Sequence, residues 1–293
     1  MKKYNTVLIL GAGASKPYGF PTQPELLTQI KSFLTSRHDF HTKLLEEKYL
    51  APDIEELLQS LKSTQRDTID DFLGAPVCKN NPAYTKIIKY AIAYALLAQE
   101  TTEQIGNPDD WYKKLYDRIF GSRDDKFTDN IAIITFNYDR SLKEYLCRTH
   151  AAMQAMSIDD ARESTLIKQI PIIHVHGKLS SSGYGGPHNF KTVVEASDGI
   201  IINTDKVTQD LSNEIIMASA IIHEATFIYI LGFGYYDENM EKIGLNKRSP
   251  GIKLIKGTAL NISRPRRNHI TGIIPGIELV QTDSKQFLMD EWM

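Results

Sequence analysis

Cysteine is scarce in this chain of 293 residues, which contains only Cys78 and Cys147. The two cysteines lie far apart in the sequence and form no C-x-x-C pair. The sequence therefore predicts neither a zinc knuckle nor a disulfide framework. Such a composition suits a reducing compartment, and we expect a cytoplasmic protein.

Long apolar runs are also missing. No uninterrupted apolar segment approaches the roughly 20 residues that a membrane-spanning helix requires. The basic start of the chain is followed by a short apolar run that ends in a glycine turn, which is typical of a strand and not of a signal peptide. We therefore expect a soluble protein that does not bind a membrane.

Neither sign of charge dominates the sequence. The chain carries 34 lysines and arginines against 36 aspartates and glutamates, for a formal net charge of −2. Because there is no basic excess, no overall field attracts nucleic acid, and direct nucleic-acid binding is not expected. The hydrophobic fraction of 42% is sufficient for an ordinary buried core.

Short apolar runs that favour strands recur along the chain. They lie at residues 7–10, 131–136, 170–175, 200–202, 226–231 and 277–280. Helical patterns separate most of these runs, and this alternation favours a parallel sheet that is covered on both faces. The sequence thus predicts an α/β fold with a doubly wound, Rossmann-like parallel sheet, in a single domain over residues 1–293.

A long helical stretch follows the first predicted strand. Thr22 and Glu25 form a T-x-x-E capping box that predicts the start of a helix. Further helical patterns follow at residues 54–61, 84–99 and 111–120, and no convincing central strand interrupts them. We therefore predict a large helical insertion over residues 24–127, between the first strand and the second.

A glycine-rich turn, GAGAS, ends the first predicted strand and contains Gly11, Ala12, Gly13 and Ser15. Glycine allows the backbone to approach a phosphate closely, and the N–H groups of such a turn bind anions. The third glycine of the dehydrogenase fingerprint is replaced by Lys16, and no Walker lysine follows, which disfavours hydride transfer and ATP hydrolysis. A tight strand exit without any ligand is a common alternative for a lone G-x-G.

Polar residues follow the next two predicted strands. The motif TFNYD places Asn137 and Asp139 at the end of one strand, and HVHGK places His174 and His176 at the end of the other. Ligands bind at the carboxyl ends of strands in an open parallel sheet. Either Asn137 or Asp139 also suits a helix cap. Strand alternation puts both histidines on one face, with His176 as the candidate for the cleft and His174 as a core residue.

Two later turns complete the set of motifs. The segment ILGFGYYDENM contains Gly232, Gly234 and Asp237, and the segment ALNIS places Asn261 at the end of a further strand. In the simplest alternative, Asp237 caps a helix and Asn261 is a solvated polar residue.

Taken in order, these motifs resemble those of the sirtuin superfamily. Sirtuins carry GAG-x-S, a G-x-P turn, T-Q-N-I-D, H-G, a later glycine turn and a strand-end asparagine. The corresponding segments here are GAGAS, GFP, TFNYD, HG, GFG and LN, which span the chain from Gly11 to Asn261. Each motif is weak by itself, but six of them in the same order are a strong signal.

The sequence also departs from deacylating sirtuins. Their four-cysteine zinc module is missing, because no cysteine follows Cys147. Pro21 and Thr22 stand in the turn where sirtuins carry P-D-F-R, and no arginine follows them. The helical insertion looks like that of the bacterial sirtuin-like domains of antiphage defence systems, which hydrolyse NAD. The resemblance therefore implies an NAD+ glycohydrolase that takes NAD as its substrate and needs no metal.

The resemblance also implies roles for individual residues. Asn137 would orient the ribose and the attacking water, Asp139 would hold the nicotinamide amide, and His176 would act as a base near the ribose hydroxyls or the water. The diphosphate would lie along the first glycine turn, and Asn261 would reach the adenosine ribose. The implied NAD-binding residues are Gly11, Ala12, Gly13, Ser15, Pro21, Thr22, Gly232, Gly234, Asp237 and Asn261.

Two other functions stay open at this stage. One is an NAD-dependent protein deacylase or ADP-ribosyltransferase on the same site, and the other is a sensor that binds NAD or ADP-ribose without turnover. An NADase of a defence system must be silent until it is triggered. Because the sequence shows no obvious sensor domain, we expect control by homo-oligomerisation or by a separate partner protein, with the helical insertion as the assembly surface.

Overall fold

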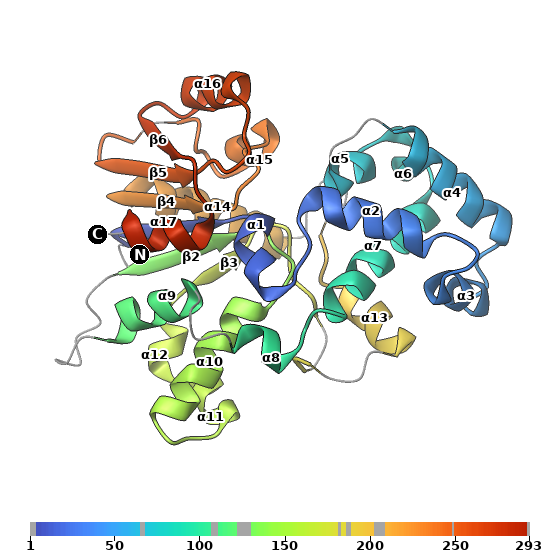
Figure 1. Cartoon of the computed structure of the whole chain (residues 1–293), viewed down its shortest axis with the longest axis horizontal. Helices are drawn as coiled ribbons and strands as arrows, with labels where there is room; N and C mark the ends of the chain where they lie inside the picture. Colours follow the sequence, from blue (N-terminus) through green and yellow to red (C-terminus); the bar gives the residue numbers. More distant parts are fainter. Residues whose placement is uncertain are drawn as a thin grey trace.

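A parallel β-sheet forms the centre of the computed structural model, which describes residues 4–64, 68–106, 111–121, 130–180, 183–185, 189–201, 209–247 and 249–291 (Figure 1). Its six strands lie in the order β3-β2-β1-β4-β5-β6, and all the pairs are parallel. The strands are β1 (Thr6–Leu10), β2 (Ile131–Thr135), β3 (Ile172–His174), β4 (Phe227–Leu231), β5 (Leu254–Thr258) and β6 (Ile277–Val280). This order is that of a Rossmann sheet, with the switch point between β1 and β4. The predicted fold class is confirmed.

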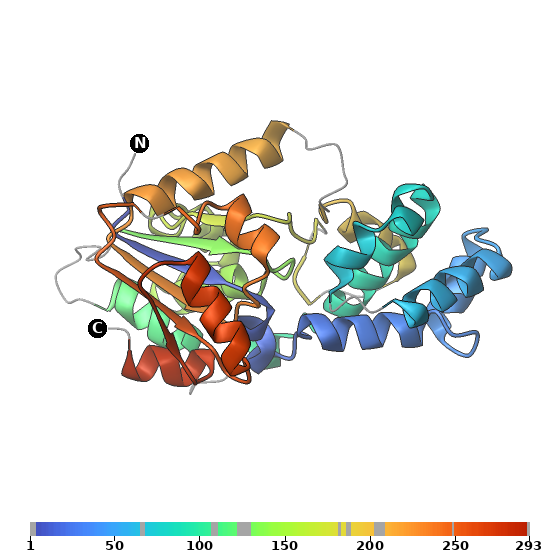
Figure 2. The same ribbon diagram turned by 90° about the horizontal axis from the view of Figure 1, so that it is seen from above.

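Helices cover both faces of the sheet, as the fully buried central strands β1 and β2 require. In β1, Leu8 and Leu10 belong to one hydrophobic cluster, whereas Val7 and Ile9 belong to another on the opposite face. The first face is covered by α9 (Trp111–Phe120), α10 (Ser141–Met153) and α17 (Ser284–Asp290). The second is covered by α14 (Gln209–Glu224), α15 (Asp237–Lys242) and α16 (Arg264–Ile273). Figure 2 shows α14 lying along its side of the sheet.

The described residues between β1 and β2 form helices and no strand. These helices are α1 (Ala12–Ser15), the 3-10 helix η1 (Lys16–Tyr18), α2 (Gln23–Phe33), α3 (Asp39–Glu46), α4 (Ala51–Ser63), α5 (Ile69–Leu73), α6 (Pro76–Lys79), α7 (Pro82–Leu97), α8 (Thr102–Ile105) and α9. Figure 1 shows α2 to α7 as a group beside the sheet, which we call the helical lobe. None of the described helices has both the length and the apolar character of a membrane span.

The predicted insertion does not form one body. A later helix, α13 (Phe190–Ser197), packs on α7 and joins the helical lobe. In contrast, α9 lies against the sheet layer and contacts α10 and α17. The remaining helices, α11 (Ile158–Glu163) and α12 (Thr165–Lys168), extend the layer that contains α10. The helical residues after β1 are therefore divided between the lobe and the layer under the sheet.

The prediction of a strand at residues 200–202 is wrong for residues 200 and 201, which the structure describes. Ile200 makes only an isolated antiparallel bridge with Gly177, and Ile202 lies outside the described residues. The reason is local, because the β3 ladder ends at His174 and Gly177 turns the chain with φ +71°. A longer strand at Ile200 would therefore have no extended neighbour to pair with. The strand expected before Asn261 is β5.

The capping box predicted at the start of α2 is present. The Glu25 carboxylate accepts hydrogen bonds from the Thr22 N–H at 2.8 Å and from the Thr22 hydroxyl at 2.7 Å. The Lys16 ammonium donates to the same carboxylate at 2.7 Å. The box fixes the direction in which the chain leaves the GAGAS turn, and thereby the position of the helical lobe relative to the sheet.

The stabilising effect of Glu25 is expected to disappear in acid. The hydrogen bond from Lys16, followed by those from Thr22, lowers the pKa of Glu25 from 4.5 to about 2. A carboxylate whose folded pKa is depressed stabilises the protein above its unfolded pKa and loses that effect as the pH falls through the folded value. The difference in unfolding free energy between wild type and Glu25→Gln should therefore shrink as the pH falls from about 4.5 to about 2. The change should be small, because the Glu25 side chain is half exposed and solvent screens its charge. Urea titrations at several pH values measure it, and a constant difference would contradict the assignment.

Candidate functional site

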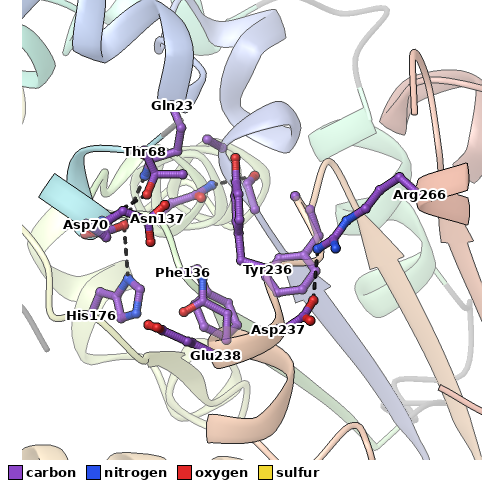
Figure 3. A pocket seen from close by; sticks show the side chains of 16 residues that line it. Gln23, Thr68, Asp70, Phe136, Asn137, His176, Tyr236, Asp237, Glu238 and Arg266 are labelled. Atoms are coloured by element: carbon purple, nitrogen blue, oxygen red, sulfur yellow. Dashed lines mark hydrogen bonds and ion pairs between the residues drawn. The ribbon is translucent and has the colours of Figure 1, made fainter. Parts of the chain in front are cut away.

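The carboxyl ends of β1 to β4 surround a cavity of about 310 Å³ (Figure 3). The strand ends contribute Gly11 and Ala12 after β1, Phe136 and Asn137 after β2, His176 after β3, and Phe233 and Gly234 after β4. The other walls are formed by Gln23, Thr68, Asp70 and Asp71 of the helical lobe and by Tyr236, Asp237, Glu238, Asn239 and Arg266. The cavity lies at the switch point of the sheet, where open α/β sheets bind their ligands, and its volume is at the lower end of the range for ligand pockets.

The glycine turns after β1 and β4 are locked together by backbone contacts. The Gly11 N–H donates to the Leu231 carbonyl at 3.0 Å, and the Gly13 N–H donates to the Gly232 carbonyl at 2.9 Å. Gly232 adopts φ +57°, and a Cβ atom there would lie 2.0 Å from the Ala14 nitrogen. The contact between the two turns therefore requires glycine. It also uses two N–H groups of the turn that we expected to face the diphosphate.

Asn137 is fixed between β2 and the GAGAS turn. Its Nδ2 donates to the Gly11 carbonyl at 3.0 Å and to Ser15 Oγ at 2.9 Å. Because the Gly11 carbonyl can only accept a hydrogen bond, the atom of the Asn137 amide that faces it must be the nitrogen. The side chain is buried, with 9% of its surface exposed, and it faces the cavity (Figure 3). The amide is thus held rigidly at the switch point.

Asp139 lies behind Asn137 and binds the start of α10. Its Oδ1 accepts from the Ser141 N–H at 3.1 Å and from the Ser141 hydroxyl, which in turn lies 2.6 Å from the Tyr112 hydroxyl. Burial raises the pKa of Asp139. These bonds hold Asp139 against the first residue of α10, but the cap position is occupied by Arg140, which makes no side-chain cap bond. Its side chain also lines a small second cavity of about 30 Å³, which shares Asn137 with the main cavity and includes Ser15 and Pro21.

His176 is almost fully buried, with 4% of its surface exposed, between two charged side chains. Its Nδ1 lies 3.9 Å from Asp70 Oδ2, and its Nε2 lies 3.3 Å from Lys242 Nζ. Burial lowers the pKa of His176 to about 4, while Asp70 raises it and Lys242 lowers it. The imidazole is therefore neutral near pH 7. Its ring also packs edge-on against Phe136, with the ring centroids 5.2 Å apart.

The sequence predicts one strand face for both histidines of HVHGK, but β3 ends at His174 and His176 lies beyond it. His174 Nδ1 donates to the Asn137 carbonyl at 3.0 Å, and His174 does not line the main cavity. The alternation of a strand is lost because β3 ends at His174 and the Gly177 N–H turns back to the His174 carbonyl. The expectation that His174 is a hydrogen-bonded core residue is confirmed.

Asp237 and Arg266 form the opposite end of the cavity from His176 (Figure 3). The Arg266 guanidinium donates to Asp237 Oδ1 at 3.0 Å and to the Tyr235 carbonyl, and His269 Nε2 lies 2.8 Å from Asp237 Oδ2. Burial raises the pKa of Asp237, but the hydrogen bonds from His269 and Arg266 outweigh it, and the pKa falls below its ordinary value. Asp237 is the first residue of α15, and the cap position is occupied by Tyr236.

The structure gathers only part of the predicted binding set around the main cavity. The predicted residues that line it are Gly11, Ala12, Asn137, His176, Gly234 and Asp237. Ser15, Pro21 and Asp139 line the small adjoining cavity, whereas Gly13, Thr22, Gly232 and Asn261 line neither of these two. Asn261 is exposed in a turn with φ +61°, a conformation that asparagine tolerates better than most residues.

Gln23, Asp70 and Arg266 are among the cavity residues that were not singled out from the sequence. Gln23 Nε2 donates to Asp70 Oδ2 at 3.3 Å, so the start of α2 and the start of α5 meet at the cavity wall. Gln23 follows the GFPT turn directly, which is the only local signal for it. Asp70 lies in the first turn of α5, and Arg266 lies in α16, a helix rich in arginine. Neither sequence pattern indicates a ligand-binding site.

The cavity lining is mostly acidic. Asp70, Asp71, Asp237 and Glu238 all line it, and Arg266 is the only lysine or arginine among the lining residues described for it. Within the described ranges of the chain, no three histidine, cysteine, aspartate or glutamate side chains are grouped as a metal site would require. Because Arg266 is paired with Asp237, the lining as a whole favours a cationic group on the ligand.

No model of a known protein family matches the chain, and no curated protein matches it either. The sirtuin resemblance therefore rests on the order of the six motifs. The structure adds that the motif residues Gly11, Asn137, His176 and Gly234, which are distant in the sequence, meet at one cavity.

Proposed function

We propose that this chain is an NAD+ glycohydrolase, which cleaves NAD to nicotinamide and ADP-ribose. The observation that carries the proposal is the cavity at the switch point, where Asn137 and His176 meet a mostly acidic lining and Arg266 lies at the end opposite His176. NAD carries a cationic nicotinamide-ribose and an anionic diphosphate. This supports an orientation with the nicotinamide-ribose beside Asn137 and the diphosphate toward Arg266.

The proposed chemistry needs few groups. Cleavage of the bond between nicotinamide and ribose passes through a sugar with oxocarbenium character, so a fixed acceptor that orients the water and acidic side chains around C1′ lower the barrier. Asn137 would orient the ribose and the water, and the neutral imidazole of His176 would lie against the ribose hydroxyls. Asp139 would reach the nicotinamide amide through the small cavity that adjoins Asn137. The proposal uses no metal.

The substrate requirement separates this proposal from a deacylase or a transferase. Wild-type protein is expected to release nicotinamide from NAD alone, at a rate that an acylated peptide does not change. Chromatography of the products with and without the peptide measures this. A strict need for the peptide would show a deacylase, and NAD left intact by the assembled protein would show a sensor without turnover.

We also propose that the enzyme is the effector of a bacterial antiphage defence system and is controlled by assembly. The helical residues of segment 24–127 are the proposed assembly surface, for further copies of the chain or for a separate partner protein. The specific activity should therefore rise with protein concentration or on addition of the partner. Activity measured alongside light scattering tests this, and a fully active monomer would rule out this control.

A further inference from the structure

The helical lobe brings a carboxylate to the wall of the cavity that faces His176. Asp70 lies on α5, whose first turn is fixed by the bond from the Asp71 N–H to Thr68 Oγ1 at 3.0 Å. The side chain is only 16% exposed, and Figure 3 shows it on the cavity side of the helix, pointing toward His176. A partly buried carboxylate is stabilised by hydrogen-bond donors around it.

Two neutral donors hold Asp70 in place. The Tyr138 hydroxyl donates to Oδ1 at 2.9 Å, and Gln23 Nε2 donates to Oδ2 at 3.3 Å. Neither donor carries a charge, and the distance of 3.9 Å from Oδ2 to His176 Nδ1 exceeds a hydrogen bond. The carboxylate is thus oriented without a direct bond to a cation, and it keeps acceptor capacity on the side of the cavity.

His176 is less well placed than Asp70 to take a proton from a water in the cavity. Lys242 Nζ lies 3.3 Å from Nε2, and a protonated lysine in that position donates to the lone pair of this nitrogen. The neutral ring then carries its hydrogen on Nδ1, which faces Asp70. In this tautomer neither ring nitrogen is open as a base, whereas Nδ1–H faces the carboxylate.

The geometry points to Asp70 as the catalytic base of the site. This inference rests on the proposed NAD glycohydrolase function. In the step, the bond between C1′ and the nicotinamide nitrogen breaks with its electron pair on that nitrogen, and nicotinamide leaves neutral. The water oxygen bonds to C1′, and its proton passes to Asp70 Oδ2 and then to solvent. Before that transfer, the carboxylate charge also stabilises the cationic sugar.

Replacement of Asp70 by asparagine tests this role, because asparagine keeps the size of the side chain and an acceptor for Tyr138. We expect Asp70→Asn to lower kcat for nicotinamide release by about 100-fold or more. The KM for NAD and the Kd for ADP-ribose should change by less than about threefold, as for a group that acts in the transition state. Formate should restore part of the kcat lost in Asp70→Ala, an effect that a merely structural residue would not show.

Two further variants serve as references. Asp159→Asn removes an exposed carboxylate from α11, outside segment 24–127 and away from the cavity, and should leave kcat unchanged. Tyr138→Phe removes one donor to Asp70 but keeps the carboxylate, and should lower kcat less than Asp70→Asn. If Asp70→Asn keeps the wild-type kcat, or loses ADP-ribose binding by as much as it loses kcat, Asp70 is not the catalytic base. Either result leaves the proposed function itself in place. A wild-type protein that never consumes NAD would overturn the proposed function itself.

Discussion

Replacement of Asn137 by alanine is expected to lower nicotinamide release from NAD by about 1000-fold, the loss typical of a preorganised polar group at a reacting centre. Asn137 is buried at the switch point, lines both cavities, and is fixed by Gly11 and Ser15. Alanine keeps the backbone but removes the side chain that bonds the end of β2 to Gly11 and Ser15 of the GAGAS turn. Initial rates at saturating NAD measure the effect.

The loss must be separated from unfolding. Alanine leaves two acceptors without their donor, at a cost of about 1 to 3 kcal/mol, so the melting temperature and the affinity for ADP-ribose should be recorded for the same sample. Asn268→Ala, on the exposed side of α16, is the matched control and should behave as wild type. Equal rates for Asn137→Ala and wild type would show that the site is misassigned.

The second large effect concerns stability. Gly232→Ala should lower the free energy of unfolding by about 3 kcal/mol, which combines the cost of a left-handed alanine with that of overpacking. Gly232 has φ +57°, and the added methyl group would meet the Ala14 nitrogen at 2.0 Å and the Gly13 carbonyl carbon at 2.3 Å. Both neighbours are backbone and cannot rotate away. The two glycine turns would have to separate.

Gly272→Ala is the matched control for this change. Gly272 lies in α16, and a methyl group there meets no atom within 4 Å. Alanine in a helix is favoured over glycine by about 0.5 to 1 kcal/mol, so this variant should be as stable as wild type or more so. Urea unfolding of both variants measures the difference. Equal stability of Gly232→Ala and wild type would mean that the turns are not locked as the contacts indicate.

The sheet was predictable because its signals are local. The apolar runs at β1, β2 and β4 are short and uninterrupted, and buried parallel strands require such runs. The run at residues 200–202 has the same composition but no neighbouring strand, and pairing is a property of the whole fold. The division of the helical segment between the lobe and the sheet layer depends on long-range packing in the same way.

The candidate site was predictable only where it lies at strand ends. Asn137 and His176 follow strands, so the topology alone brings them to the cavity. Asp70 stands 67 positions before Asn137 in a helical lobe, and only the docking of α5 beside the sheet places it there. The glycines of the turns after β1 and β4 were visible in the sequence, but their role was not. A motif typical of phosphate binding also allows these two turns to pack together.

The most direct measurement of the central claim is the fate of NAD in water enriched in oxygen-18. If the switch-point cavity hydrolyses NAD, wild-type protein in its active state should give equimolar nicotinamide and ADP-ribose, and mass spectrometry should find one labelled oxygen, at C1′ of the ribose. Intact NAD, or ADP-ribose attached to another molecule without the label, would contradict a glycohydrolase.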